Sequence, residues 1–375
     1  MNILFIGLFL VLPFSNFLFT KLDMWHAQGF FFQVGLLVAY SLHIFKKNKP
    51  LGSLLLWSGL LTSYYWLIIL EQGKGYAVQV FLPFFNFLCM VICYDLIVKY
   101  PTKENLQKLL TYLTIPVSLV LIYALLQRLQ LDQFYSGLAH GPDKLVGTIG
   151  NPMHLGHYLC ICLPCFLMLS GEWRKIGILA ILGIIILTQS MTSLCIAVIV
   201  LIFCSCFKRI FKLREILLIG VLLVLFYALQ YNTINDAIKN FTFSQGRFEF
   251  WSKLFPVFKQ KPITGWGLGI MNALAQQKEF LGWRHVHNEF FHFSVELGLI
   301  GFSIIIWGVI DYFKTFWKIK GESLSVILAG MFLAFTLTSL FGYPAHLWIS
   351  SGMAILAYAG MYLLKESYDS NLKGN

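Results

Sequence analysis

Long apolar runs separated by short polar links extend along the whole chain. A helix needs about 20 mostly apolar residues to cross the hydrocarbon core of a bilayer. Windows of this kind lie near 3–20, 28–45, 51–70, 76–98, 109–128, 153–170, 174–189, 192–207, 215–231, 289–311, 323–341 and 347–364. The pattern predicts an all-α, polytopic integral membrane protein: about 12 transmembrane helices that form a single membrane domain, residues 1–375.

The composition agrees with this pattern. Hydrophobic residues make up 58% of the chain, charged residues only 12%, and the mean hydropathy is +0.73. A soluble protein cannot cover its surface with so few charges. The net charge of +11 does not indicate a nucleic-acid partner, because most Lys and Arg residues lie in short links between apolar runs. We therefore expect contacts with membrane lipids and none with nucleic acid.

The eight cysteines all lie inside apolar runs. Cys160, Cys162 and Cys165 are spaced closely enough to suggest a metal site, but no polar residue accompanies them in LCICLPCFLML. We interpret the cysteines as small packing residues and expect no disulfide framework.

The basic residues divide the links into two sides of the membrane. Seventeen Lys and Arg residues lie in the links of one side, and four lie in the short links of the other. The positive-inside rule assigns the richer side, and with it both termini, to the cytoplasm. The outer face then carries the link 130–152, a turn at Thr188–Ser193 and a long loop over residues 232–288, which is periplasmic if the membrane is a bacterial inner membrane.

The long outer loop carries the pattern of a folded segment. In SQGRFEFWSKLFPVFKQKP, helical spacing places Phe248, Trp251, Phe255 and Phe258 on one face, and Ser244 is a plausible N-cap. This pattern is typical of a helix that lies in the membrane interface. PITGWGLG then predicts a glycine-rich turn, and MNALAQQKEFLGW predicts a short helix.

Histidines and carboxylates gather where this loop returns to the membrane, in WRHVHNEFFHFSVELGLIG. If a helix begins near His285, then His285, Glu289, His292 and Glu296 share one face. Three interpretations compete: interfacial polar residues, a metal site, and acid–base chemistry. Neither HExxH nor HxxEH occurs, which disfavours a metal. Glu296 would lie about two turns inside the membrane, where a carboxylate needs a partner.

These motifs resemble those of the O-antigen ligase and polymerase superfamily. GRFEFW, PITGWGLG and HVHNEFFHFSVELGLIG match its glycine–arginine helix start, its P-x2-G-x-G turn, and its His-Asn followed by a Glu-Leu-Gly-x-x-Gly helix. The earlier GTIGNPMHLGHYL resembles its Gly-Asn-Pro-Asn segment, with Met153 at the usual second Asn. The resemblance predicts an O-antigen ligase-like core region at 147–341.

The resemblance implies a glycosyltransferase at the periplasmic face of the bacterial inner membrane. Its donor would be a glycan on undecaprenyl diphosphate, and its acceptor would be lipid A–core, as in O-antigen ligases. The alternatives are a repeat-unit polymerase that uses a second lipid-linked glycan, a protein O-oligosaccharyltransferase and, outside the enzymes, a membrane transporter. We expect no metal and no cofactor, because a diphosphate is already a good leaving group.

Matching positions give the expected site. His287 would accept the proton of the acceptor hydroxyl, and Arg247 would bind the diphosphate. Arg284 is a further phosphate-binding candidate because it is near in sequence. The other expected substrate-binding residues are Asn151, Asn288, Glu289 and Glu296.

One position departs from the family pattern. Many family members carry Ser-Arg in the outer turn between the middle spans, where this chain has Ser190 followed by Met191. We expect Arg284, Lys144 or Arg128 to replace the missing arginine, or else weaker donor binding or a different lipid carrier.

Overall fold

The computed structural model describes residues 102–129, 145–208, 220, 247–274, 286–342 and 348–373. Over these ranges the chain is helical and contains no strand, as predicted. The elements are α6 (Lys103–Tyr112), α7 (Thr114–Arg128), the 3-10 helix η3 (Gly147–Ile149), α8 (Pro152–Cys162), the 3-10 helix η4 (Leu163–Met168), α9 (Gly171–Leu187), α10 (Met191–Lys208), α13 (Arg247–Gln260), α14 (Ile270–Leu274), α15 (Glu289–Lys318), α16 (Ser323–Phe341) and α17 (Trp348–Lys373).

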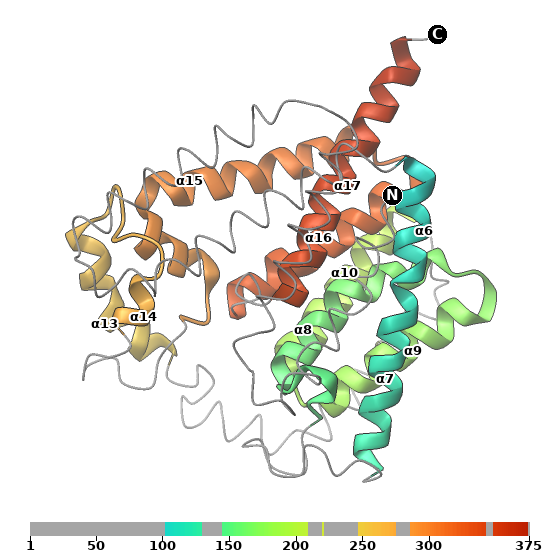
Figure 1. The fold of residues 1–375 in the computed structure, drawn as a ribbon, viewed down its shortest axis with the longest axis horizontal. Helices are drawn as coiled ribbons and strands as arrows, with labels where there is room; N and C mark the ends of the chain where they lie inside the picture. Colours follow the sequence, from blue (N-terminus) through green and yellow to red (C-terminus); the bar gives the residue numbers. More distant parts are fainter. Residues whose placement is uncertain are drawn as a thin grey trace, which may run out of the picture.

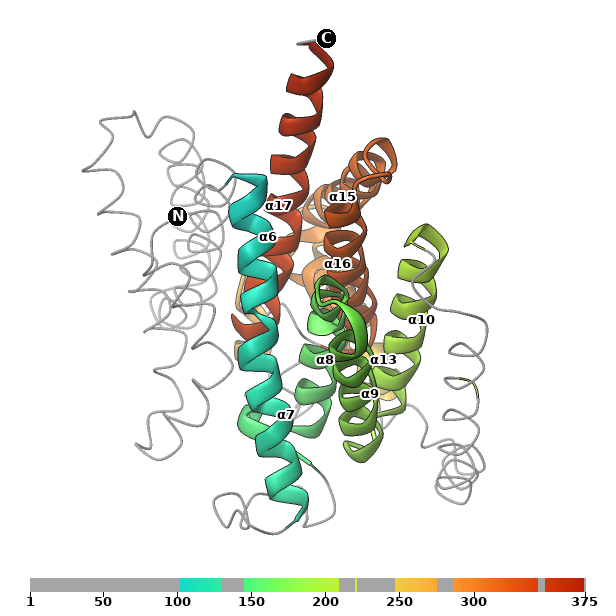
Figure 2. The same ribbon diagram turned by 90° about the vertical axis from the view of Figure 1, so that its right-hand side faces the viewer.

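Three of the described helical stretches are long and apolar enough to cross a membrane. They are Lys103–Arg128, in which α6 and α7 form one column (Figure 2), and helices α15 and α16. Helix α16 has the bounds of its predicted window, whereas α15 continues seven residues beyond residue 311, the predicted end. The windows near 3–20, 28–45, 51–70, 76–98 and 215–231 lie outside the described residues, so the total of about 12 spans stays a prediction.

The window 153–170, predicted as one span, consists of two pieces. Helix α8 ends at Cys162, and the 3-10 helix η4 continues to Met168. Pro164 lacks a backbone N–H and cannot continue regular α-helical bonding, which explains the change of helix type. The predicted turn between two helices is confirmed but is shorter than Thr188–Ser193, because α9 ends at Leu187 and α10 begins at Met191. Its place on the outer side of the membrane stays a prediction.

Helix α16 is the centre of the bundle and packs against α8, α10, α15 and α17 (Figure 1). At Gly330 of α16, an added Cβ would lie 2.7 Å from Sγ of Cys204 and 3.0 Å from Cγ of Pro164. This glycine therefore permits the close helix approach that membrane bundles use. Cys204, like Cys160, Cys162 and Cys165, is buried in the bundle, which agrees with the predicted packing role.

Helix α13 packs on the bundle mainly through residues outside the predicted aromatic face, and the position of that face in the membrane interface stays a prediction. Phe250 and Leu254 are buried against α14 and α15, whereas Phe248 and Phe255 are 67% and 47% exposed. Trp251 is half-buried, and its indole N–H donates to the carbonyl of Val286 at 2.8 Å. The four aromatic residues therefore do not share one environment, because the helix must also cover the start of α15. Ser244 lies outside the described residues.

Helix α15 is broken at Gly298, whose φ of 65° and ψ of −168° are not helical. The glycine-rich turn that follows α13 docks into this break. Four backbone hydrogen bonds join the two segments: Trp266 N–H to Val295 O (3.0 Å), Gly267 N–H to Glu296 O (2.7 Å), Leu299 N–H to Pro262 O (2.8 Å) and Ile300 N–H to Ile263 O (3.2 Å). An unsatisfied backbone group in a membrane costs several kcal/mol. The turn stabilises the break because it supplies hydrogen-bond partners for these groups.

Two glycines allow this docking. Gly265 and Gly298 both have positive φ, 72° and 65°, and their backbones are in contact. A Cβ on Gly265 would collide with the carbonyl oxygen of Glu296, and a Cβ on Gly298 would collide with that of Ile263. The P-x2-G-x-G and Glu-Leu-Gly motifs are therefore the two halves of one backbone junction.

We expect Gly298→Ala to lower the free energy of unfolding by more than about 2 kcal/mol, since a left-handed alanine is itself strained and its methyl group would also meet the backbone of the turn. Thermal unfolding of the detergent-purified protein measures the change. Gly183→Ala is the matched control, because nothing lies within 4 Å of its Cβ position inside α9. Equal melting temperatures for the two variants would contradict the role given to the junction.

Candidate functional site

Arg247, the first residue of α13, lies between two helix ends from other parts of the bundle. Its Nη1 donates to the carbonyl oxygen of Phe341, the last residue of α16, at 3.1 Å. Its Nη2 lies 4.0 Å from Sδ of Met153, in the first turn of α8. The guanidinium therefore joins three elements that are far apart in the sequence.

The guanidinium of Arg247 is half-buried, and burial lowers its pKa from the usual value. Arginine nevertheless remains protonated at neutral pH. Among the described residues, no carboxylate forms an ion pair with it. The first turn of α13 thus presents a positive charge that is held by a carbonyl and a thioether.

His287 has a backbone conformation that is uncommon for a residue with a side chain. Its φ is 54°, in the left-handed region, and its side chain is half-buried. Burial, and after it the positive charge of Arg247, lower the pKa of its imidazole to about 4, and the carboxylate of Glu289 opposes the shift. His287 is therefore neutral at pH 7. Backbone strain of this kind clusters at functional sites, which makes His287 a candidate for function.

Helix α15 begins where the predicted span 289–311 begins, so the alternative start near His285, on which the shared face with His285 depended, does not hold. The helix begins at Glu289, and Asn288 is its N-cap, with Oδ1 accepting from the N–H of Phe291 at 2.9 Å. Asparagine is a strong N-cap, and the left-handed His287 before it turns the chain away from the helix axis. His285 and Arg284 lie outside the described residues.

Glu289, His292 and Glu296 do share one face, and each is about 2% exposed. Oε1 of Glu296 accepts from the N–H of Gly269 at 2.8 Å and lies 3.0 Å from Nε2 of His292. The carboxylate predicted to need a partner has one in the glycine-rich turn. These contacts give Glu296 a structural role at the junction, and its contact with substrate stays a prediction.

Asn151 caps α8 in the segment that resembles the Gly-Asn-Pro-Asn motif. Its Oδ1 accepts from the N–H groups of Met153 and His154, at 2.9 and 3.3 Å, and Pro152 occupies the first helical position. This helix start holds Met153 against Arg247. Asn151 therefore belongs to the same end of the bundle as the arginine.

The motif also contains a site residue that the sequence analysis did not single out. His157 is 1% exposed and lies within electrostatic reach of Arg247 and His287. A Cβ on Gly342, just after α16, would be only 2.5 Å from its Cε1. Nε2 of His157 has no hydrogen-bond partner among the described residues. Its spacing of four from Met153 places both on one face of α8, a signal that was available in GNPMHLGHYL.

Among the described residues, none of the expected replacements for the arginine missing at Met191 lies at that position. Met191 is the first residue of α10 and packs against the hydrophobic core. Arg128 is exposed at the end of α7. Arg284 and Lys144 lie outside the described residues, so that part of the prediction stays open. The described ranges also contain no group of three or more His, Cys, Asp or Glu residues that could hold a metal ion.

Comparison with known protein families gives one match. Residues 176–306 match the O-antigen ligase family. The matched region runs from α9 into the first part of α15 and includes Arg247, His287 and both halves of the glycine junction. No curated protein sequence matches the chain. Apolar helices long enough to span a bilayer indicate a membrane protein, and residues 176–306 of the chain are similar to the O-antigen ligase family.

Proposed function

We propose that this membrane protein transfers a glycan from undecaprenyl diphosphate to an acceptor hydroxyl, with lipid A–core as the acceptor, at the periplasmic face of the inner membrane. The observation that carries the proposal is the approach of Arg247 to His287, close enough for one charge to shift the pKa of the other. Both residues lie in the region that matches the O-antigen ligase family.

The chemistry needs one base and one cation. The acceptor oxygen attacks the anomeric carbon of the donor, and the bond from that carbon to the phosphate oxygen breaks. The proton of the acceptor passes to Nδ1 or Nε2 of His287, which is neutral at pH 7. Undecaprenyl diphosphate leaves with the electron pair, and Arg247 offsets its negative charge through paired hydrogen bonds.

The charge of Arg247 also links donor binding to the strength of the base. In the free protein this charge helps to hold the pKa of His287 near 4, which favours the neutral imidazole but makes it a weak base. A bound diphosphate would offset the positive charge, and the pKa of His287 would rise toward its ordinary value. The base would thus become stronger only when a donor is in place.

The remaining sequence candidates lie around these two residues. Asn288 and Asn151 begin the two helices that frame the site, and Glu289 lies beside His287. His157 adds a second buried imidazole within electrostatic reach of Arg247. We assign substrate contacts to Arg247, Asn151, Asn288, Glu289 and, if it lies nearby, Arg284, and the proton transfer to His287.

We expect His287→Asn to reduce glycan transfer by at least about 100-fold, the usual contribution of a general base. Asparagine tolerates the left-handed backbone of this position, so the change removes the base without adding strain. The assay uses the full chain in liposomes with a lipid-linked glycan, and lipid A–core, a second lipid-linked glycan or a protein is offered as acceptor. Gln189→Asn, at another left-handed position in an exposed turn, is the matched control.

The acceptor that is consumed distinguishes a ligase from a polymerase or a protein glycosyltransferase. Full transfer by His287→Asn would refute the assignment of the base. If wild-type protein transferred glycan to none of the three acceptors, the proposed activity itself would be wrong, and a membrane transporter would become the better interpretation.

We expect Arg247→Gln to raise the pKa of His287 above about 4, because a neighbouring positive charge is removed while the burial remains. The rate of carbethoxylation at His287 by diethylpyrocarbonate, followed against pH by mass spectrometry, measures this pKa. Lys253→Gln removes one charge from the exposed side of the same helix, where the lysine pairs with Glu249, and should leave the pKa unchanged. An unchanged pKa in Arg247→Gln would argue against the coupling.

We expect transfer to persist when divalent cations are removed with a chelator, since Arg247 supplies the positive charge that metals provide elsewhere. The rate in chelator is compared with the rate after excess Mg²⁺ or Mn²⁺ is restored. A loss of more than about tenfold that the metal reverses would contradict a metal-independent mechanism.

A further inference from the structure

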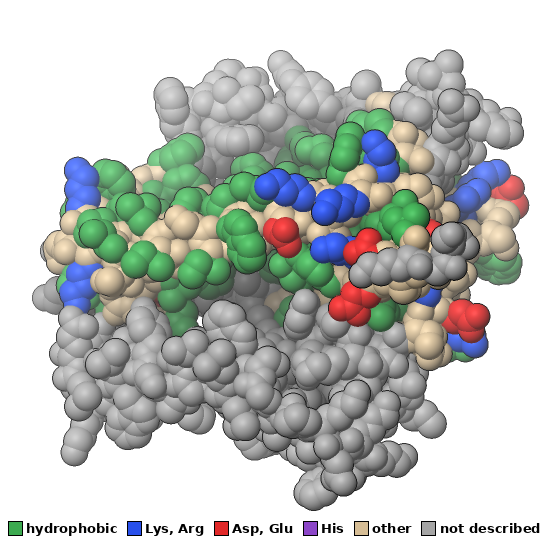
Figure 3. All heavy atoms as spheres, turned by 90° about the horizontal axis from the view of Figure 1, so that it is seen from above, with side chains coloured by type: hydrophobic (Ala, Val, Ile, Leu, Met, Phe, Trp, Pro, Cys, Tyr) green, Lys and Arg blue, Asp and Glu red, His purple; other side chains and the backbone are tan. Residues whose placement is uncertain are grey.

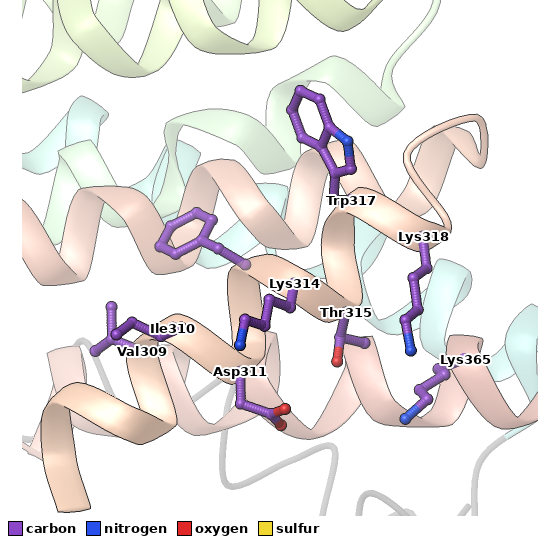
Figure 4. A pocket seen from close by; sticks show the side chains of 9 residues that line it. Val309, Ile310, Asp311, Lys314, Thr315, Trp317, Lys318 and Lys365 are labelled. Atoms are coloured by element: carbon purple, nitrogen blue, oxygen red, sulfur yellow. The ribbon is translucent and has the colours of Figure 1, made fainter.

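A cavity of about 650 Å³ lies between α15 and α17, at the opposite end of α15 from His287. Figure 4 shows its polar part, where side chains of Asp311, Lys314, Thr315 and Lys318 from α15 face Lys365 from α17. Lys314 lies 16 residues, roughly 24 Å of helix, beyond the break at Gly298, and Glu289 lies on the other side of that break, so this cavity is separate from the candidate site.

The polar end of the cavity is positively charged. Lys314, Lys318 and Lys365 all line it; in Figure 4 the ammonium groups of Lys318 and Lys365 point toward each other, and that of Lys314 lies on the side of Asp311. The one carboxylate there, Asp311, accepts a hydrogen bond from the hydroxyl of Tyr362. Seen from this end, Lys and Arg side chains gather with a few carboxylates on the surface (Figure 3). Three lysines against one carboxylate leave an excess of positive charge, which attracts an anion.

The other end of the cavity is apolar. Val309, Ile310 and Phe313 line it, and Ile310 is 47% exposed. The apolar surface continues along the outer side of α15, where Ile304 and Trp307 are 61% and 67% exposed. A ligand that fits both ends must be amphipathic, with an anionic head and a hydrocarbon tail. A free inorganic anion would use the lysines alone.

Trp317 indicates that the cavity lies at the boundary between the hydrocarbon core and water. Its side chain is 60% exposed beside the lysines, and Nζ of Lys320 lies 3.8 Å from the centroid of its ring. Exposed tryptophan and lysine together are typical of the boundary between hydrocarbon and water. The distribution of basic residues predicts that this end of the bundle faces the cytoplasm, where anionic lipids attract basic groups at membrane surfaces.

We propose that this cavity binds the phosphate of an anionic glycerophospholipid, with an acyl chain lying along Val309, Ile310 and Phe313. Lys318 and Lys365 bind the phosphate as point charges with several N–H donors each, Lys314 adds positive charge to the same cavity, and Thr315 lies in the same wall. Asp311 is held by Tyr362, which turns part of its negative charge away from the phosphate. The proposal does not depend on glycan transfer at the other end of the molecule.

Native mass spectrometry of the full-length protein tests it, with phosphatidylglycerol and phosphatidylcholine of the same acyl chains as probes. Wild-type protein should retain phosphatidylglycerol in preference to phosphatidylcholine. The triple variant Lys314→Gln, Lys318→Gln, Lys365→Gln should retain at least about tenfold less phosphatidylglycerol, since each basic residue near a membrane surface contributes measurably to binding. Lys365→Gln alone should cause a smaller loss in the same direction.

The matched control is Lys103→Gln, Lys108→Gln, Lys175→Gln, which removes the same charge from the side of the chain predicted to be cytoplasmic. Lys103 and Lys175 already pair with Glu322 and Glu172, and none of the three lines the cavity. This control should retain phosphatidylglycerol like the wild type. Equal loss in the two triple variants would show a general charge effect and overturn the site.

Two other results would also overturn the proposal. Equal retention of the two phospholipids by wild-type protein would show that the phosphate charge is not recognised, because phosphatidylcholine is zwitterionic. Complete displacement of phosphatidylglycerol by millimolar inorganic phosphate would show that the lysines bind a free anion and that the apolar wall contributes nothing. Retention that survives inorganic phosphate but is lost in the lysine variant supports a lipid.

Discussion

The docking of the glycine-rich turn into the break of α15 is the contact on which the rest of the described site depends. A helix that crosses a bilayer satisfies its own backbone groups, and a break at Gly298 would leave several of them without partners in an apolar environment. The turn from Pro262 to Gly267 supplies those partners through the backbone. Because the contact is backbone to backbone, it requires glycine at Gly265 and at Gly298 rather than any particular side chain.

This junction also sets where the charged groups lie. The turn follows α13 directly, so fixing the turn on α15 fixes α13 beside the start of that helix, with Phe250 and Leu254 buried in the contact. Arg247, at the first residue of α13, is then held against the end of α16 and the start of α8. The carboxylate of Glu296 strengthens the same junction through the N–H of Gly269. Part of the polar motif at the start of α15 therefore stabilises the fold.

The two ends of α15 carry different chemistry. Near Glu289 the helix meets a half-buried arginine and a neutral histidine in a strained conformation. Near Lys318 it carries lysines beside an apolar groove and an exposed tryptophan. The first arrangement is the one on which the proposed reaction rests, because it holds a cation close to a neutral imidazole. The second suits a membrane surface, where lysines contact anionic headgroups and apolar side chains contact acyl chains.

The sequence alone determined the helical class, the bounds of α16, the start of α15 and the break between α9 and α10, because the length of an apolar run reports directly on the thickness of the bilayer. It could not determine whether the helix extended back toward His285, since that pattern has the same periodicity, and the N-cap geometry of Asn288 places the first helical residue at Glu289. Nor could it show that Glu296 binds the glycine turn or that His157 lies beside Arg247. Those contacts join residues that are far apart in the chain, and only the packing of α8, α13, α15 and α16 around one another brings them together.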